Sequence, residues 1–151
     1  MVNMLSNIGV LVLATLPSAL GSTLNVQNNC PFQIFCGAAK NDGTFSPGVP
    51  VPGGGHRWTS PLPANDDNIG SVLKCANNAG LAKPFQMELA LQNGHSWFDL
   101  SALDGDPFIG VSRHAEIAGQ CVLDCPPGSV ACEWPIQPDC QTSENAWLTL
   151  C

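Results

Sequence analysis

The sequence has no sustained helical periodicity. Outside one short apolar run near its start, no window of 11 residues repeats its apolar positions every three to four residues, and no internal repeat is visible. Short segments that alternate apolar and polar residues are instead separated by turns rich in glycine and proline. This pattern argues against helical bundles and α/β folds and predicts an all-β sandwich or barrel.

Basic residues are scarce in this chain. Five Lys and Arg stand against 12 Asp and Glu, for a net charge of −7. Such a chain repels phosphate backbones and anionic lipids, which argues against nucleic acid and membrane surfaces as partners. The sequence also has no second long apolar run, no apolar C-terminal tail and no Asn-x-Ser/Thr sequon. We therefore expect neither a membrane anchor nor N-glycosylation.

Motifs for covalent, phosphate or metal chemistry are missing. There is no G-x-S-x-G, no H-E-x-x-H and no glycine-rich loop ahead of a helix. Asp104-Gly105-Asp106 begins like a calcium loop, but no further acceptors follow at ligand spacing, which favours a turn. No C-x2-C or H-x3-H element supports zinc, and His56, His95 and His114 share no ligand spacing. We expect no cofactor and no metal, and the motifs indicate no reaction.

A short apolar run from Ile8 to Leu16 lies near the N-terminus. It is too short to span a bilayer, which takes about 20 residues. Pro17 ends it, and Ala19-Leu20-Gly21 carries the small residues that a signal peptidase reads. We predict that residues 1–21 are a secretory signal peptide, rather than a short buried helix, and that residues 22–151 form one secreted, extracellular domain.

All eight cysteines follow the predicted cleavage site: Cys30, Cys36, Cys75, Cys121, Cys125, Cys132, Cys140 and Cys151. An even number behind a secretory signal predicts a disulfide framework formed in an oxidising compartment. Eight cysteines allow 105 pairings, and the spacings do not choose among them.

Besides a hairpin over residues 85–102, six segments are predicted to be strands: 23–27, 32–36, 56–60, 71–75, 108–112 and 146–151. Residues 41–55 hold five Gly and three Pro and are predicted to be a loop. Residues 121–140 hold four Pro and four Cys and are predicted to be an irregular excursion held by disulfides.

A β-hairpin over residues 85–102 is the strongest local signal. Residues 85–92 alternate apolar and polar without a break, and Asn93-Gly94 is the dipeptide best suited to a two-residue turn. Such a turn sets residue 92 opposite residue 95, which places Leu89 opposite Phe98 on a mostly apolar face. The other face carries Gln86, Glu88, Ala90, Gln92, His95, Trp97, Asp99 and Ser101.

In this register Glu88 falls directly opposite Asp99. Two like charges with Cβ atoms about 5 Å apart destabilise a sheet and titrate as a unit. Three interpretations are open. The pair is structural and neutralised by Lys74 or Arg57; or it belongs to a face that binds a cation or sugar hydroxyls, with Trp97 stacked on the sugar; or it catalyses glycoside hydrolysis.

Several segments resemble thaumatin-like proteins. Residues 26–32, Val-Gln-Asn-Asn-Cys-Pro-Phe, resemble that family's opening strand and first cysteine, and residues 88–91, Glu-Leu-Ala-Leu, resemble its E-F-[ST]-L strand. Residues 97–105, Trp-Phe-Asp-Leu-Ser-Ala-Leu-Asp-Gly, resemble its aromatic-aromatic-D-V-S-L-V-D-G segment, and residues 148–151 its last strand. Residues 105–108, Gly-Asp-Pro-Phe, and the compact length are most similar to short secreted fungal proteins, the Blastomyces yeast-phase-specific family.

This resemblance implies a disulfide-stapled antiparallel β-sandwich with an acidic cleft. Glu88, Asp99 and Asp104 fall on positions of the family's cleft acids, and Lys74 lies near its arginine. The family's last cleft aspartate lies in a disulfide-rich region that is shortened here, so no residue is assigned to it, and the family's G-x-T-G-D-C-G segment is missing.

The resemblance also bears on the disulfides. It places the strands beside Cys30 and Cys151 next to each other, which implies that these two cysteines pair. We further predict a Cys36–Cys75 bond. Cys121, Cys125, Cys132 and Cys140 are then left to pair among themselves, in one of three ways.

We predict a secreted, non-enzymatic binding protein that recognises a cell-wall polysaccharide or an extracellular host protein, as a fungal effector would. The predicted binding face comprises Glu88, Asp99, Asp104, Trp97, Gln86, His95 and Lys74. One alternative is a weak β-glucan hydrolase that uses Glu88 and Asp99, and another is a structural surface protein.

Overall fold

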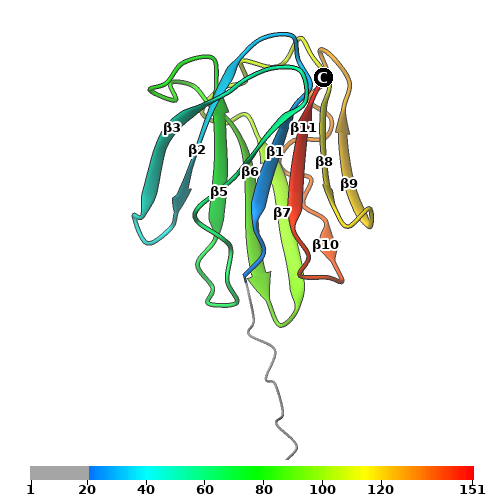
Figure 1. Ribbon diagram of the computed structural model, residues 1–151. Coiled ribbons are helices and arrows are strands. Elements are labelled where there is room, and N and C mark those ends of the chain that lie inside the picture. The colour runs from blue at the N-terminus through cyan, green and yellow to red at the C-terminus, as the bar shows by residue number, and fades with distance from the viewer. Residues whose placement is uncertain (1–20) are drawn as a thin grey trace, which may run out of the picture.

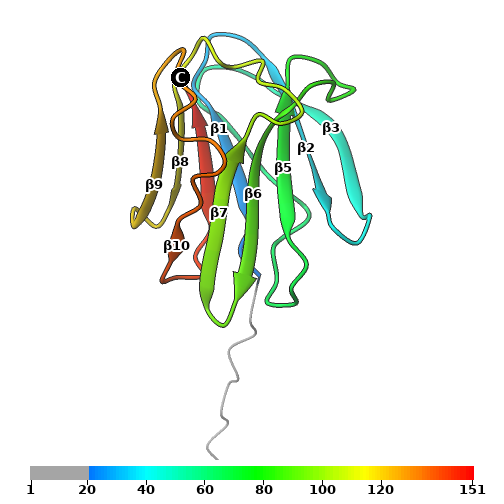
Figure 2. The ribbon, with the colours of Figure 1, turned by 180° about the vertical axis from the view of Figure 1, so that it is seen from behind.

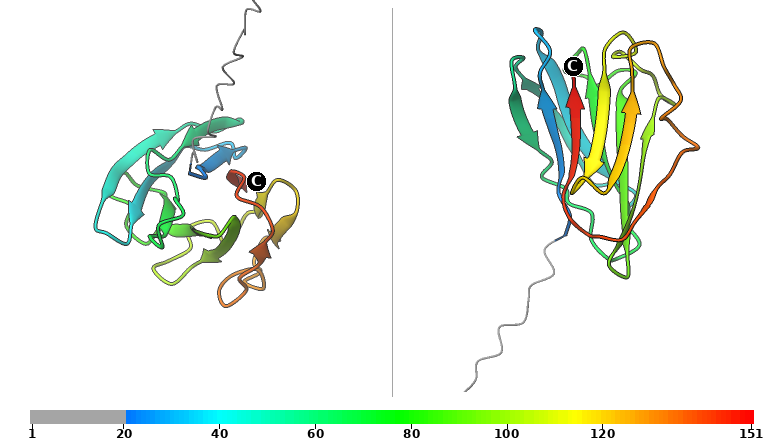
Figure 3. Two further views of the ribbon diagram at one scale, coloured as in Figure 1. Left: turned by 90° about the horizontal axis from the view of Figure 1, so that it is seen from below. Right: turned by 90° about the vertical axis from the view of Figure 1, so that its right-hand side faces the viewer.

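The computed structural model describes residues 21–151, and every regular element in that range is a β-strand (Figure 1). The strands are β1 (Leu24–Asn28), β2 (Ile34–Lys40), β3 (Phe45–Val51), β4 (His56–Thr59), β5 (Ser71–Ala76), β6 (Phe85–Gln92), β7 (His95–Ser101), β8 (Arg113–Ile117), β9 (Cys121–Cys125), β10 (Asp139–Cys140) and β11 (Ala146–Leu150). They form two sheets that pack face to face, which confirms the predicted all-β sandwich (Figure 3).

The two sheets differ in size. One has five strands in the order β4-β1-β11-β8-β9, and the other has six in the order β10-β7-β6-β5-β2-β3. The first sheet faces the viewer in Figure 1, and the second is seen from outside in Figure 2. Neighbouring strands run antiparallel except for β1 and β11, which pair in parallel from Leu24 opposite Ala146 to Asn28 opposite Leu150. Parallel neighbours need a long connection, and here most of the described chain supplies it.

The core follows from the alternation along each strand. In β11 the side chains of Ala146, Leu148 and Leu150 are buried, whereas Trp147 and Thr149 lie on the outside. The other central strands repeat this pattern from both sheets, so the inward side chains meet in one apolar layer.

Four disulfides join all eight cysteines. The pairs are Cys30–Cys151, Cys36–Cys75, Cys121–Cys140 and Cys125–Cys132. They include both pairs named from the sequence. The first links the end regions of β1 and β11, and the second crosses the neighbouring strands β2 and β5, where the two cysteines lie in register. No cysteine among residues 21–151 is left free.

Two segments predicted to be irregular contain strands. β3 lies inside the predicted loop 41–55, at the edge of the six-stranded sheet. An edge strand tolerates Pro47 and Pro50 because half of its N–H groups need no partner. β9 and the two-residue β10 lie inside the predicted excursion 121–140. β9 alternates in burial and pairs with β8 along its whole length, which its cysteines and the following prolines concealed.

The prediction of a strand at 108–112 is wrong. These residues form turns, in which the Val111 amide donates to the Phe108 carbonyl and the Phe108 amide donates to the Asp106 side chain. The strand is β8, which starts at Arg113. The sequence did not predict β8 because Arg113 occupies its first inward position. A charged residue breaks the alternation of apolar and polar residues from which strands are predicted.

The predicted signal peptide, residues 1–21, lies outside the described residues except for Gly21. Within residues 21–151, no helix is long and apolar enough to cross a membrane.

Candidate functional site: an acidic cleft

The hairpin β6–β7 places the two candidate carboxylates side by side. Asn93 and Gly94 both have positive φ, 53° and 79°, as a two-residue turn of this type requires. Glu88 lies opposite Asp99, and Leu89 lies opposite Phe98, so the predicted register is confirmed. Leu89 is buried, and its neighbour Glu88 points to the outer face of the six-stranded sheet.

The segment between β9 and β10 covers part of this outer face. It runs outside the sandwich along β7 (orange in the right-hand view of Figure 3). The Trp134 amide donates to the Leu100 carbonyl at 2.8 Å, and Gln137 Nε2 donates to Asp99 Oδ2 at 3.0 Å. Asp99 is consequently only 5% exposed, whereas Glu88, one strand further from the segment, remains exposed.

A groove results on both sides of the carboxylate pair. Its larger part is a cleft of about 470 Å³ lined by Glu88, Asp99, Ser101, Ala102, Leu103, Glu133, Trp134 and Gln137. A neighbouring hollow of about 270 Å³ shares Glu88, Asp99 and Gln137 and adds Lys74, Gln86 and Trp97, among others. Trp134 is 62% exposed and Leu103 is 91% exposed, so the cleft has an apolar rim above an acidic floor.

A buried arginine anchors the covering segment. Arg113 is fully buried, and its Nη1 donates to Glu133 Oε1 at 2.7 Å and also to Asp106. Its Nη2 donates to the Ser129 carbonyl, and its guanidinium lies 5.2 Å from the centre of the Phe85 ring. Burial raises the pKa of Asp106, against the opposing hydrogen bond from the Phe108 amide and the charge of Arg113. This ion-pair cluster holds the cleft wall against the sandwich.

The carboxylates in the groove have raised affinity for protons. Burial is the main cause that raises the pKa of Glu88, and the negative charges of Asp99 and Asp104 raise it further, while Lys74 lowers it. Burial also raises the pKa of Asp99, against the hydrogen bond from Gln137. The pair can therefore accept hydrogen bonds from ligand hydroxyls when ionised, and it releases its protons less readily than exposed carboxyl groups do.

The structure brings together most of the residues named from the sequence. Lys74, Gln86 and Trp97 line the smaller hollow with the carboxylate pair, although Gln86 is largely buried. Asp104 acts on Glu88 through its charge and lines neither hollow. His95 also lies outside both hollows, since its Nδ1 contacts Asp139 Oδ1 at 3.0 Å.

The expected neutralising partners do not bind the pair. Arg57 belongs to β4, in the other sheet. Among residues 21–151, neither Glu88 nor Asp99 has a basic nitrogen within 4.0 Å, so Lys74 acts only at longer range. The interpretation as a neutralised structural ion pair therefore has no contact to support it.

Six of the eight residues that line the cleft are absent from the binding face predicted from the sequence: Ser101, Ala102, Leu103, Glu133, Trp134 and Gln137. Three of them lie in the disulfide-bonded excursion, where no periodicity assigns a face. One signal was present, namely a tryptophan in an otherwise polar, proline-rich segment between Cys132 and Cys140. An exposed aromatic residue in such a loop is typical of binding surfaces.

The described residues show no site for a resident metal. Within residues 21–151, no three His, Cys, Asp or Glu side chains are placed so that they could share an ion.

Comparison with known proteins identifies the fold and the family. The protein elicitor MoHrip2 from Magnaporthe oryzae has a similar structure, with a TM-score of 0.75 and 21% identity over 87% of this chain and 99% of that one. The thaumatin-like xylanase inhibitor TLXI gives a TM-score of 0.62 and 13% identity over 85% of this chain and 98% of its own. Both show a thaumatin-like fold for this chain.

No curated protein sequence matches the chain. The family model of the Blastomyces yeast-phase-specific protein, in contrast, matches residues 10–151, nearly the whole length. The chain therefore belongs to the Blastomyces yeast-phase-specific protein family.

Proposed function

We propose that this protein is secreted and binds, without catalysis, a cell-wall polysaccharide in the acidic cleft. The observation that carries the proposal is the cleft itself, in which the Glu88–Asp99 pair faces the rim formed by Trp134. Four disulfides support secretion, because such a framework persists in oxidising compartments.

The cleft offers both kinds of contact that a sugar needs. The carboxylates of Glu88 and Asp99 accept hydrogen bonds from hydroxyl groups, and charge-assisted bonds of this kind are about twice as strong as neutral ones. Trp134, and Trp97 at the far end of the groove, expose ring surface on which a pyranose can stack.

The burial of Asp99 favours binding over hydrolysis. A nucleophile or general base must reach the sugar or a water molecule, yet Asp99 is 5% exposed and one of its oxygens already accepts from Gln137. Within residues 21–151 no basic nitrogen lies within 4.0 Å of either carboxylate, which also fits a ligand-binding role, because repulsion between the carboxylates is tolerated where hydroxyl donors relieve it.

A protein target is a second candidate, supported by a separate observation. Leu103, Trp134 and Ile136 expose apolar surface around the cleft, and the exposed fraction of Leu103 is 91%. Exposed apolar groups of this kind are frequent at protein interfaces. The two similar structures are those of a protein elicitor and of a xylanase inhibitor, and an inhibitor of an enzyme acts by binding another protein.

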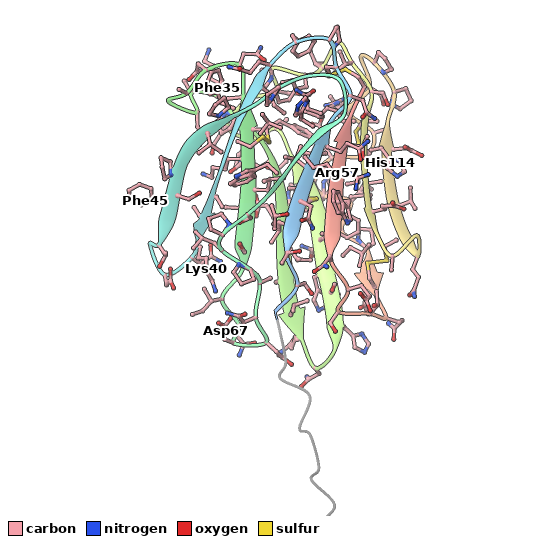
Figure 4. All side chains as sticks on the ribbon, in the orientation of Figure 1. Phe35, Lys40, Phe45, Arg57, Asp67 and His114 are labelled. Carbon is pink, nitrogen blue, oxygen red and sulfur yellow. A yellow bond between two sulfur atoms is a disulfide. The ribbon has the colours of Figure 1, made fainter. Side chains whose placement is uncertain are left out.

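A glycan array probed with the disulfide-intact protein tests the proposal. We expect the protein to bind fragments of wall polysaccharide. Glu88→Gln and Trp134→Ala should each lower the affinity about tenfold. Phe45→Ala is the matched control, because Phe45 is an exposed aromatic on β3, three strands away from β6 (Figure 4). A reducing-sugar assay on the bound fragments should show no release.

Each other outcome points to another function. Release of reducing sugar that Glu88→Gln abolishes would establish the hydrolase. Capture of one defined extracellular protein, lost in Trp134→Ala and kept in Phe45→Ala, would establish the protein target. Binding to neither class would favour a structural surface protein.

A further inference from the structure

The outer face of the five-stranded sheet carries a second hollow, on the opposite side of the sandwich from the acidic cleft. The hollow measures about 200 Å³ and is lined by Gln27, Arg57, Glu116, Trp147 and Thr149. These residues belong to four adjacent strands, β4, β1, β11 and β8. Figure 4 shows Arg57 in front of this sheet, on the side from which His114 also projects.

Arg57 is held in place at the edge of this hollow. Its Nε donates to Gln27 Oε1 at 2.8 Å, and its guanidinium carbon lies 5.1 Å from the centre of the Trp147 ring. Gln27 is itself fixed, because its Nε2 donates to Asn29 Oδ1 at 2.8 Å. Stacking and a hydrogen bond at Nε do not use the two terminal nitrogens of the guanidinium.

The remaining polar groups of the hollow are unused. Within residues 21–151, the terminal nitrogens of Arg57 find no acceptor, and no acid lies within 4.0 Å of them. Glu116 lines the same hollow and forms no ion pair with any described residue. The hollow thus presents three polar groups to a ligand. They are the two terminal nitrogens of the Arg57 guanidinium, which act as a paired donor, the Thr149 hydroxyl and the Glu116 carboxylate, which acts as an acceptor.

We propose that this hollow binds a uronic-acid residue of a saccharide. The fork of Arg57 matches a carboxylate, and a bidentate guanidinium–carboxylate pair is among the strongest charge-assisted contacts. Glu116 makes the hollow unsuitable for a bare anion such as phosphate, but it suits a ligand that also offers hydroxyl donors. A sugar that carries one carboxylate and several hydroxyls satisfies both groups.

The net charge of the chain further restricts the class of saccharide that can bind. At −7 the protein repels polyanions at long range, so a polymer of uronic acids is disfavoured. A single uronic-acid branch on a neutral saccharide avoids this repulsion and still reaches Arg57. This site is separate from the acidic cleft, and neither proposal depends on the other.

Methyl β-glucuronide and its neutral counterpart, methyl β-glucoside, are the probes for the test. Titration of the isotope-labelled protein is followed by NMR, with the indole N–H of Trp147 and the amides of β11 as reporters. We expect the glucuronide to shift these signals and the glucoside to leave them unchanged. Arg57→Gln should lower the affinity for the glucuronide about tenfold or more. Arg57→Lys keeps the charge but loses the bidentate donor, and it should lower the affinity too.

Two controls make the result decisive. Lys83→Gln removes one positive charge at an exposed position away from the hollow and should leave the titration unchanged. Glu144→Gln removes one negative charge at an exposed position that lines none of the hollows and should also have no effect. Equal shifts with the glucoside, equal binding of acetate, or unchanged affinity in folded Arg57→Gln would each overturn the proposal.

Discussion

Replacing Glu88 with Gln should stabilise this protein at neutral pH. The substitution keeps the side-chain shape and removes one of two like charges that lie in register on β6 and β7. Like charges opposite each other cost roughly 0.2–1 kcal/mol in an antiparallel pair. In a chain of this size, that gain corresponds to a rise in melting temperature of about 1–4 °C.

The pH dependence of this gain has a defined sign. Burial and the neighbouring acids raise the pKa of Glu88 in the folded state above the ordinary value of 4.5, and burial raises the pKa of Asp99 above 3.8. A group with a raised folded pKa binds its proton more tightly in the folded state, so its ionisation destabilises the fold as pH rises through that pKa. The stability gained by the variant should therefore shrink as pH falls through the raised pKa values, and it should vanish below the ordinary values of 4.5 and 3.8.

The difference between the two proteins is the quantity to measure, because other acids move the absolute stability in the opposite direction. The pKa values of Asp42 and Asp67 are lowered, chiefly by backbone hydrogen bonds from Thr44 and Ile69. Their contributions to stability are lost as pH falls, and they cancel when the wild type and the variant are compared at the same pH.

Thermal melts of Glu88→Gln, Asp99→Asn and the double variant complete the test. Asn at position 99 can still accept from Gln137, so the covering segment stays attached. The double variant should gain less than the sum of the single variants, since the repulsion is removed only once. Glu144→Gln, at an exposed position outside the cleft, is the control and should change the stability by less than about 0.5 kcal/mol. A lower melting temperature in both single variants at pH 7 would show that the carboxylates are structural and would refute the reasoning.

Three further predictions concern the framework around the site. Replacing Cys30 and Cys151 with Ser removes a cross-link between residues 121 apart in sequence, which should lower the free energy of unfolding by about 5 kcal/mol in denaturant titrations. Arg113→Ala leaves Asp106 and Glu133 without their buried partner and should lower the free energy of unfolding by about 3–5 kcal/mol. Hydrogen exchange should accelerate first in residues 129–137, and a uniform acceleration across the domain would contradict the role of Arg113 as the anchor of that segment. Gly94→Ala should cost about 1 kcal/mol through its φ of 79° alone, because an added Cβ meets no atom within 4 Å; an unchanged unfolding curve would mean that the turn relaxes.

Local features of the sequence determined the hairpin that carries the acidic pair. The period-2 pattern of residues 85–92 assigns each side chain to a face, and Asn93-Gly94 sets the register because few other dipeptides adopt two positive φ angles. Both signals act over a few residues and need no knowledge of the rest of the chain. The family resemblance likewise rests on contiguous segments, and it extended the prediction to the sandwich.

Only the tertiary structure decided what covers that face. Asp99 is buried because Gln137 and Trp134, from the segment before β10, fold back over β7. Arg113 reads as a surface residue in the sequence, yet it occupies an inward position because distant acids reach it. Alternation distinguishes the two faces of a strand, but it carries no information about which distant segment packs on each face. That depends on disulfides, buried ion pairs and chain connections that span many residues, and these contacts turned a predicted acidic face into a cleft.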